Sequence, residues 1–135
     1  MDKATLGQYR YLLKEIKSLE ARIKKLERVS SDKVTASNVE FPYQRISVTV
    51  EGVESTQAAE KLRAILRHRR MECEAAKLSI ESFIAGIDDS RTRLVFERRY
   101  IYGWSYQKIS IYLGSRHESY ARYIHDEYLK STAEE

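Results

Sequence analysis

The chain has 135 residues, a formal net charge of +4, 33% charged residues and 10% aromatic residues. This balance predicts a folded helical protein and excludes an intrinsically disordered one. No run approaches the 18 apolar residues that a membrane-spanning helix needs. The charged N-terminus and the single cysteine, Cys73, predict a cytoplasmic, reduced protein without a membrane partner.

Two long apolar stripes dominate the first 87 residues, and both advance in the alternating steps of three and four that are typical of coiled coils. The first stripe contains Tyr9, Leu12, Ile16, Leu19, Ile23 and Leu26. The second contains Ala59, Leu62, Leu66, Cys73, Ala76, Ile80, Phe83 and Ile87, is interrupted by Arg69, and includes Cys73 as a packing residue. Because apolar helix faces associate in water, the stripes predict either an antiparallel hairpin of residues 5–29 on 55–87 or a homo-oligomer, with a dimer favoured.

Residues 30–54 separate the stripes and carry polar residues throughout, so we interpret them as a linker. They contain the only proline, Pro42, and end near Gly52. An alternation of apolar and polar residues there is also typical of a short strand, although an isolated strand lacks a pairing partner. The apolar positions are Ile46, Val48 and Val50, and Asn38 with residues 41–43 could dock against the helices. Residues 1–87 are thus predicted to form a helical oligomerisation region.

A helix is predicted from about Asp88 to Tyr102, because an acidic pair and a serine can cap its start and Gly103 can end it. It exposes a set of arginines that either form a solvated surface or contact phosphates. These are Arg91, Arg93, Arg98 and Arg99. A second basic run, Arg67 to Arg70, has the same two interpretations.

Residues 105–130 have the spacing of a helix-turn-helix. Ser105 can cap the first helix, whose inward positions are Ile109 and Leu113 with Tyr106 or Tyr112 at the edge. Two helices that cross through a tight turn need a small residue at the contact and a residue that tolerates positive φ at the turn. Ser110 and Gly114 fit these requirements.

The second helix of the motif is predicted to begin near Arg116, since residues 115–118 have the S-x-x-E form of a capping box. Its expected inward positions are Tyr120, Ile124 (or Tyr123) and Tyr128. The opposite face then offers Arg116, His117, Ser119, Arg122 and His125 to a major groove. The fold class that follows is all-α, with long N-terminal coiled-coil-like helices and a C-terminal three-helix domain at residues 88–135.

The sequence around these helices resembles region 4 of sigma-70-type factors, and more closely the phage and prophage late-gene activators of the ArpU/RinA type. The resemblance rests on residues 99–105 (RYIYGWS), Ile109, residues 113–115 (LGS) and a helix with Arg122 and His125. It is confined to residues 87–130, and Ser110, Tyr120 and Glu127 depart from the pattern. The resemblance implies promoter DNA binding in a host bacterial cell and a contact with RNA polymerase.

The resulting functional hypothesis is a sequence-specific DNA-binding transcription regulator. The residues expected to contact DNA are Gln107, Lys108, Ser115, Arg116, His117, Ser119, Arg122, Tyr123 and His125. Of these, Gln107 and Lys108 are expected to contact the sugar-phosphate backbone of the DNA. Tyr106 and Tyr123 are further candidates for phosphate contacts. The alternatives are a DNA-packaging protein of the small terminase subunit kind and a coiled-coil adaptor that binds RNA polymerase without touching DNA.

Catalysis is not expected, because no nucleophile is paired with a base and no glycine-rich loop could cradle a phosphate. The three histidines share no metal-ligand spacing with Cys73 or a carboxylate, so no metal or other cofactor is predicted. Residues 88–135 contain eight Lys or Arg and eight Asp or Glu, so this domain is formally neutral. The prediction of DNA binding therefore depends on where the charges lie.

Overall fold

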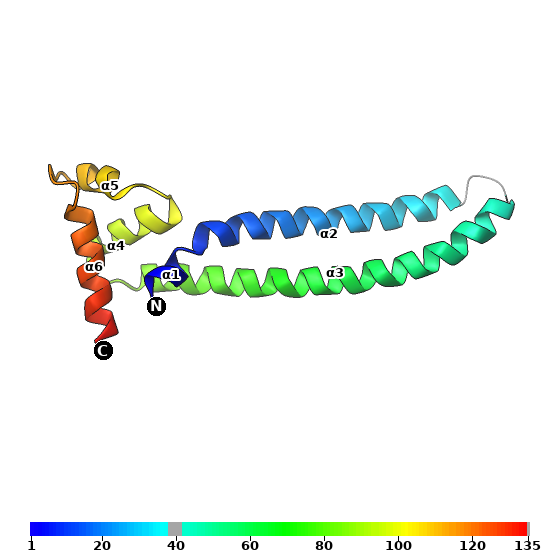
Figure 1. Ribbon diagram of the computed structural model, residues 1–135, viewed down its shortest axis with the longest axis horizontal. Coiled ribbons are helices and arrows are strands. Elements are labelled where there is room, and N and C mark those ends of the chain that lie inside the picture. The colour runs from blue at the N-terminus through cyan, green and yellow to red at the C-terminus, as the bar shows by residue number, and fades with distance from the viewer. Residues whose placement is uncertain (38–41, 135) are drawn as a thin grey trace. The chain divides into compact units, whose positions relative to one another are not determined.

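A computed structural model describes the backbone of residues 1–37 and 42–134 and the side chains of residues 1–28 and 56–134 (Figure 1). All regular elements of these residues are helices, so the predicted all-α class is confirmed. In chain order they are α1 (Lys3–Leu6), α2 (Tyr9–Ser37), α3 (Pro42–Ala85), α4 (Ser90–Phe96), the π-helix η1 (Glu97–Ile101), α5 (Tyr106–Tyr112) and α6 (Tyr120–Ala133).

The predicted linker is largely helical. Helix α2 continues to Ser37 and α3 begins at Pro42, so the prediction of an irregular segment or a strand is wrong for residues 30–37 and 42–54. Extending a helix adds one hydrogen bond per residue, whereas an isolated strand has no partner. Proline also fits the first turn of a helix, where its missing N–H costs nothing. Asn38 and Phe41 lie outside the described residues.

The chain divides into two compact units, which we call the terminal unit (residues 1–14 and 74–135) and the hairpin unit (residues 15–73). This division differs from the boundary predicted at residue 87. The reason is a cluster in which the N-terminal residues pack on the end of α3 and on the elements that follow it. This N-terminal core consists of Leu6, Tyr9, Ile80, Ile84, Ile87, Phe96 and Tyr100. Fully burying one such side chain contributes about 1.5–3 kcal/mol.

In the hairpin unit, α2 and α3 run side by side in opposite directions (Figure 1). The ion pairs between the two helices show the antiparallel direction. Glu27 pairs with Arg67, whereas Glu20, which lies closer to the start of α2, pairs with Arg70, which lies further along α3. The predicted stripes supply the buried positions, which are Ile16, Leu19, Ile23, Leu66 and Cys73. Burial raises the pKa of the Cys73 thiol, as expected for a packing residue.

In the terminal unit, the start of α4 and the end of η1 are fixed as predicted. The Asp89 carboxylate accepts hydrogen bonds from the backbone N–H and the hydroxyl of Thr92, at 3.0 and 2.8 Å, and so caps α4. After η1 the chain turns at Gly103, which has φ +74°. A Cβ atom there would lie 2.8 Å from the Arg10 guanidinium, so both the backbone and the packing favour glycine.

Candidate nucleic-acid interface

Helix α5 begins and ends where the sequence predicts. The Ser105 hydroxyl accepts a hydrogen bond from the backbone N–H of Lys108 at 3.1 Å, which caps the helix start. Gly114 has φ +84° in the turn that follows, and nothing lies within 4 Å of a Cβ placed there. The glycine is therefore required by its backbone conformation and not by crowding.

Ser110 joins α5 to α6 and is fully buried. Its hydroxyl donates to the carbonyl of Tyr106 at 2.8 Å, lies 3.2 Å from the carbonyl of Glu118, and accepts from the backbone N–H of Ala121 at 3.0 Å. The N–H groups of a helix's first turn have no partner within the helix. Ser110 thus supplies from α5 a cap for the start of α6, which explains a serine at the small position of the helix contact.

The predicted start of the second motif helix is wrong. Helix α6 begins at Tyr120, and the side chain of its N-cap residue Ser119 makes no capping hydrogen bond to the described first turn of the helix. The expected capping box does not form, because the Ser115 hydroxyl accepts from the N–H of His117 at 3.2 Å in a local turn. The Glu118 carboxylate instead accepts from the Gln107 side-chain amide at 3.1 Å. Arg116 and His117 consequently lie in the turn that precedes α6.

The predicted inward face of α6 is confirmed at Ile124, and Tyr120 and Tyr128 pack at its edge, but the prediction missed Ala121 and His125. The buried residues are Ala121, Ile124 and His125, whereas Tyr120 and Tyr128 are half-buried. The predicted face advanced in steps of four, but a helix face includes both the third and the fourth residue, which places position 125 inside with 121. Ala121 and Ile124 pack with Val95, Tyr106 and Ile109 in a cluster that we call the C-terminal core.

His125 was predicted to contact DNA, and this prediction is wrong because its side chain is fully buried. The ring stacks on Phe96 with centroids 4.8 Å apart, and its Nε2 is hydrogen-bonded to the Tyr100 hydroxyl. The Nδ1 atom lies 2.9 Å from a carboxylate oxygen of Asp126. A carboxylate only accepts, so Nδ1 carries the proton and Nε2 accepts from Tyr100. Burial lowers the pKa of His125, although Asp126 acts in the opposite direction.

The other predicted contact residues lie at or near the surface of α5, the turn and the first part of α6. Ser115 is half-buried, and the exposed ones are Gln107, Lys108, Arg116, His117, Ser119, Arg122 and Tyr123. Three of them are cations, Lys108, Arg116 and Arg122, and none forms an ion pair with a carboxylate of the described residues. Their charge is therefore not neutralised by an acidic side chain in contact.

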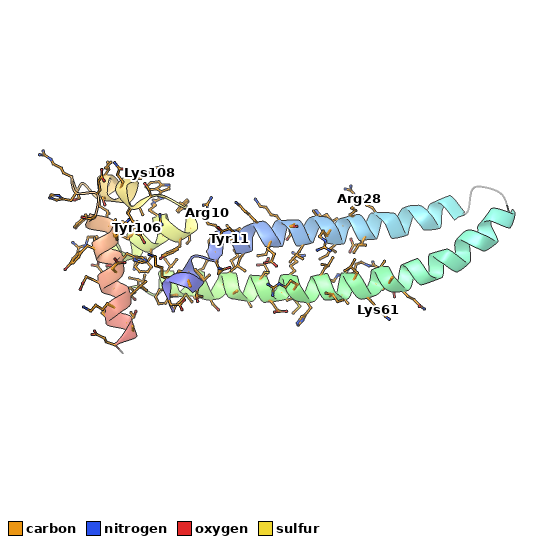
Figure 2. The ribbon with its side chains drawn as sticks, viewed as in Figure 1. Arg10, Tyr11, Arg28, Lys61, Tyr106 and Lys108 are labelled. Atoms are coloured by element: carbon orange, nitrogen blue, oxygen red, sulfur yellow. The ribbon has the colours of Figure 1, made fainter. Side chains whose placement is uncertain are left out.

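Aromatic rings lie under several of these cations. The Lys108 ammonium lies 4.2 Å from the centre of the Trp104 ring, and the Arg122 guanidinium lies 5.2 Å from the centre of the Tyr106 ring. Lys108 and Tyr106 both project from α5 (Figure 2). Tyr106 is buried, so the prediction that it contacts phosphates is wrong. Its ring supports cations instead.

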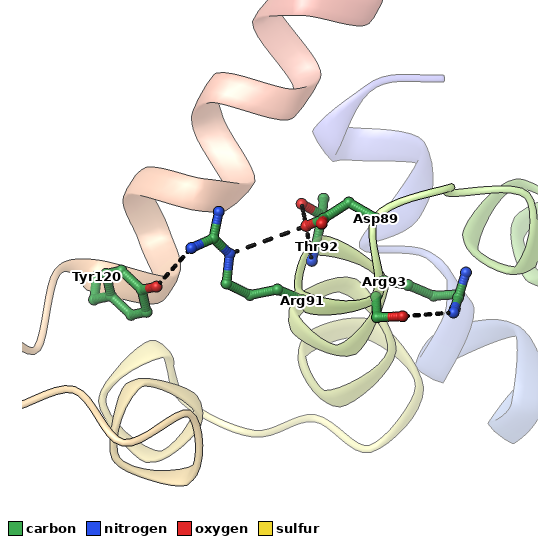
Figure 3. Close-up of polar contacts among 6 residues, drawn as sticks. Asp89, Arg91, Thr92, Arg93 and Tyr120 are labelled. Carbon is green, nitrogen blue, oxygen red and sulfur yellow. Dashed lines mark hydrogen bonds and ion pairs between the residues drawn. The ribbon is translucent and has the colours of Figure 1, made fainter.

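Three arginines of α4 and η1, Arg91, Arg93 and Arg98, are engaged within the terminal unit, against their interpretation as phosphate contacts. Arg91 donates to the Tyr120 hydroxyl at 3.0 Å, linking the starts of α4 and α6 (Figure 3). Arg93 donates to the carbonyl of Ile87 at 2.6 Å. The Arg98 guanidinium lies about 5 Å from the centres of three rings, those of Tyr102, Trp104 and Tyr112. Sequence reasoning missed these aromatic platforms, although seven of the ten tyrosines fall between residues 100 and 128.

The basic run on α3 has structural partners in the hairpin unit. Arg67, Arg69 and Arg70 form ion pairs with Glu27, Glu15 and Glu20 of α2, at 2.9, 3.1 and 2.9 Å. His68 pairs with Glu72 one turn along α3. These contacts favour the solvated-surface interpretation over a phosphate contact.

Across residues 1–37 and 42–134, no group of three or more His, Cys, Asp or Glu side chains is arranged to hold a metal ion. The same residues include no helix with the length and apolarity needed to span a bilayer. Compared with models of protein families, with curated proteins and with solved structures, the chain matches none of them. The function must therefore be argued from the residues themselves.

Proposed function

We propose that the chain is a sequence-specific DNA-binding transcription regulator. In this proposal α4 to α6 act as a three-helix domain of the helix-turn-helix kind, and α5, the turn and the start of α6 lie in the major groove. The observation that carries the proposal is a set of exposed cations on these segments that lack a carboxylate partner among the described side chains, namely Lys108, Arg116 and Arg122. Unneutralised cations are what phosphate and guanine contacts require.

The rigid setting of these cations supports the proposal further. Trp104 and Tyr106 lie under Lys108 and Arg122, and the Ser110 hydroxyl ties α5 to the start of α6. A long basic side chain that is already partly ordered loses less conformational entropy when it binds. In this proposal Arg122 reads a base, Lys108 contacts phosphates, and Arg116 with His117 reaches the DNA from the turn. Ser119 and Tyr123 contribute polar contacts beside them.

The resemblance to sigma-70 region 4 and to ArpU/RinA-type activators extends the proposal to a phage-encoded activator of late genes. Such a protein would act in the bacterial cytoplasm and contact host RNA polymerase. We further propose a homodimer, since helix-turn-helix dimers read paired half-sites. Exposed apolar residues on α3 support self-association, because Ile65 is 64% and Met71 is 70% exposed.

The test is a salt titration of binding to random and to native upstream duplex, with the oligomer mass determined in the same buffer. Binding that prefers the native duplex, and whose affinity falls steeply with salt, is expected of the regulator. A ring of many subunits would favour a DNA-packaging protein of the small terminase subunit kind. Absence of binding to either duplex at low salt would contradict DNA recognition and leave an adaptor that binds RNA polymerase.

A further inference from the structure

A small basic cavity lies in the terminal unit, formed by segments far apart in the sequence. It has a volume of about 240 Å³ and is lined by Gly7, Arg10, Arg99, Tyr100 and Gly103. Pockets for drug-sized ligands measure roughly 300–1,000 Å³, so this one suits a small group. Two of its five lining residues are arginines and none is acidic. We propose that this cavity binds a phosphate group between Arg10 and Arg99.

Both guanidinium groups are held in place without being neutralised. Arg10 donates to the carbonyl of Ile101 at 3.2 Å, and Arg99 donates to the carbonyl of Trp104 at 3.1 Å. Neither arginine forms an ion pair with an acidic side chain in the described part of the chain. A guanidinium has five N–H donors, and each of these bonds uses one. Donors and positive charge therefore remain for a ligand.

The walls of the cavity fix the direction of the two side chains. The Arg99 guanidinium lies 4.2 Å from the centre of the Tyr106 ring, and Arg99 is half-buried. Arg10 lies against Gly103, where a Cβ atom would stand 2.8 Å from its guanidinium. The Tyr100 hydroxyl is already hydrogen-bonded to His125, so the ligand's partners are the two arginines. A phosphate carries close to two negative charges at neutral pH, which two guanidinium groups match. The planar N–H donors of each guanidinium can also bind two phosphate oxygens at once.

Such a phosphate could be a free ion or a backbone phosphate of a duplex. Both sources offer non-bridging oxygens to the two arginines, but a free phosphate carries close to two negative charges and a backbone phosphodiester carries one. The experiments therefore separate the two sources. The proposal that the cavity binds a phosphate does not depend on the proposed function. Only the possibility that this phosphate belongs to a DNA duplex rests on the proposed function. A free phosphate can therefore bind even where DNA recognition fails.

The first experiment is a calorimetric titration of the full chain with inorganic phosphate, with ionic strength held constant by sodium chloride. We expect saturable binding that weakens about ten-fold or more in Arg10→Gln, because half of the cationic pair is lost. Arg10→Lys should recover part of the affinity, since it keeps the charge but not the planar fork. Arg22→Gln, which removes an exposed arginine of the hairpin unit, should bind as the unchanged chain does.

The melting temperatures of the variants show whether a loss of binding reflects unfolding. A wild-type chain that fails to bind phosphate over chloride, or an Arg10→Gln chain that binds it equally well, would overturn the proposal. The second experiment repeats the duplex salt titration with Arg10→Gln. The site binds a backbone phosphate if the slope of log affinity against log salt concentration falls by about one unit in the variant and if inorganic phosphate competes with the duplex. An unchanged slope alongside impaired phosphate binding assigns a free ion.

Discussion

The arginines of the hairpin unit and of the terminal unit are held by different partners. On α3, Arg67, Arg69 and Arg70 each contact a glutamate of α2. Around η1, α5 and α6, Arg98, Arg99 and Arg122 lie instead over aromatic rings. An ion pair cancels the field of a cation at a distance, whereas a ring orders the cation and leaves its charge.

This difference shows why net charge alone misleads here. Residues 88–135 are formally neutral, with eight cations and eight anions. Part of their negative charge lies at helix ends, as with Asp89, which caps α4, and part is bound to other groups, as with Asp126, which contacts His125. Lys108, Arg116 and Arg122, which have no carboxylate partner among the described residues, are available for phosphate. The predictions that follow test this contrast, beginning with the largest expected effect.

The first prediction compares two histidines, one in each unit. His125→Ala should lower the free energy of unfolding by about 3–5 kcal/mol, because it removes a buried ring from its stack on Phe96 and leaves the Tyr100 hydroxyl unpaired. His68→Ala should change it by less than about 0.5 kcal/mol, since the His68 side chain is 77% exposed. Urea unfolding followed by circular dichroism measures both. Similar small losses would contradict the burial of His125.

The second prediction concerns the contact between α5 and α6. Ser110→Ala should cost about 1–3 kcal/mol of unfolding free energy, because the buried N–H of Ala121 loses its acceptor. Ser119→Ala is the matched control, since Ser119 stands at the N-cap of α6 but its side chain makes no capping hydrogen bond to the described first turn. It should cost little. Hydrogen exchange at the Ala121 amide should accelerate in the first variant only, and equal exchange in both would show that Ser110 does not cap α6.

The third prediction tests whether the unpaired cations bind DNA. Arg122→Ala should lower the affinity for the native duplex by about 1–3 kcal/mol, if it makes a bidentate guanine contact. Lys108→Ala should instead weaken all sequences alike and reduce the salt slope by about one unit. Arg67→Ala is the control from the hairpin unit, because Arg67 is paired with Glu27. Equal losses on native and random duplex for Arg122→Ala would remove it from base reading.

The fourth prediction is a pH dependence of the terminal unit. Burial holds the pKa of His125 below its ordinary value of 6.5, so the unfolded chain takes up a proton more readily than the folded one. The stabilisation that neutral His125 gives to the folded chain is therefore fully present above pH 7, and the free energy of unfolding falls as the pH drops below about 6.5. One proton accounts for at most about 1.4 kcal/mol per pH unit. Urea unfolding between pH 5 and 8 should show this fall in His117→Ala and lack it in His125→Ala.

Local rules predicted much of this molecule. The caps Asp89 and Ser105 and the positive φ of Gly114 could be found from the sequence, because each depends on neighbours within a few positions. The spacing of the motif also indicated Ser110 as the small contact residue, although its partner Ala121 lies 11 positions away. The apolar stripe of α2 was found in the same way, and Ile16 is among its buried residues. Short-range geometry therefore specifies these caps, this turn and this stripe, whereas it missed the start of α6 and the helical state of residues 30–37 and 42–54.

The features that could not be predicted depend on distant partners. Helix spacing places position 125 on the inner face with position 121, but the stacking surface of Phe96 and the hydrogen bond to Tyr100, which suit a histidine there, lie outside α6. The placement of residues 1–14 with the C-terminal helices follows from contacts such as Leu6 in the N-terminal core. A polar residue on a helix was thus assigned to solvent when its partner lay 25 positions away.

The smallest expected effect lies in the ion pairs of the hairpin unit. Arg70 and Glu20 contact at 2.9 Å, yet their side chains are 44% and 39% exposed, so solvent screens their attraction. A double-mutant cycle with Arg70→Ala and Glu20→Ala should give a coupling energy of about 0.2–1 kcal/mol, shrinking in 1 M salt. A coupling of several kcal/mol that persists in salt would contradict this screening. The hairpin unit would then owe much of its stability to charge pairs, and the burial of Ile16, Leu19 and Leu66 would matter less.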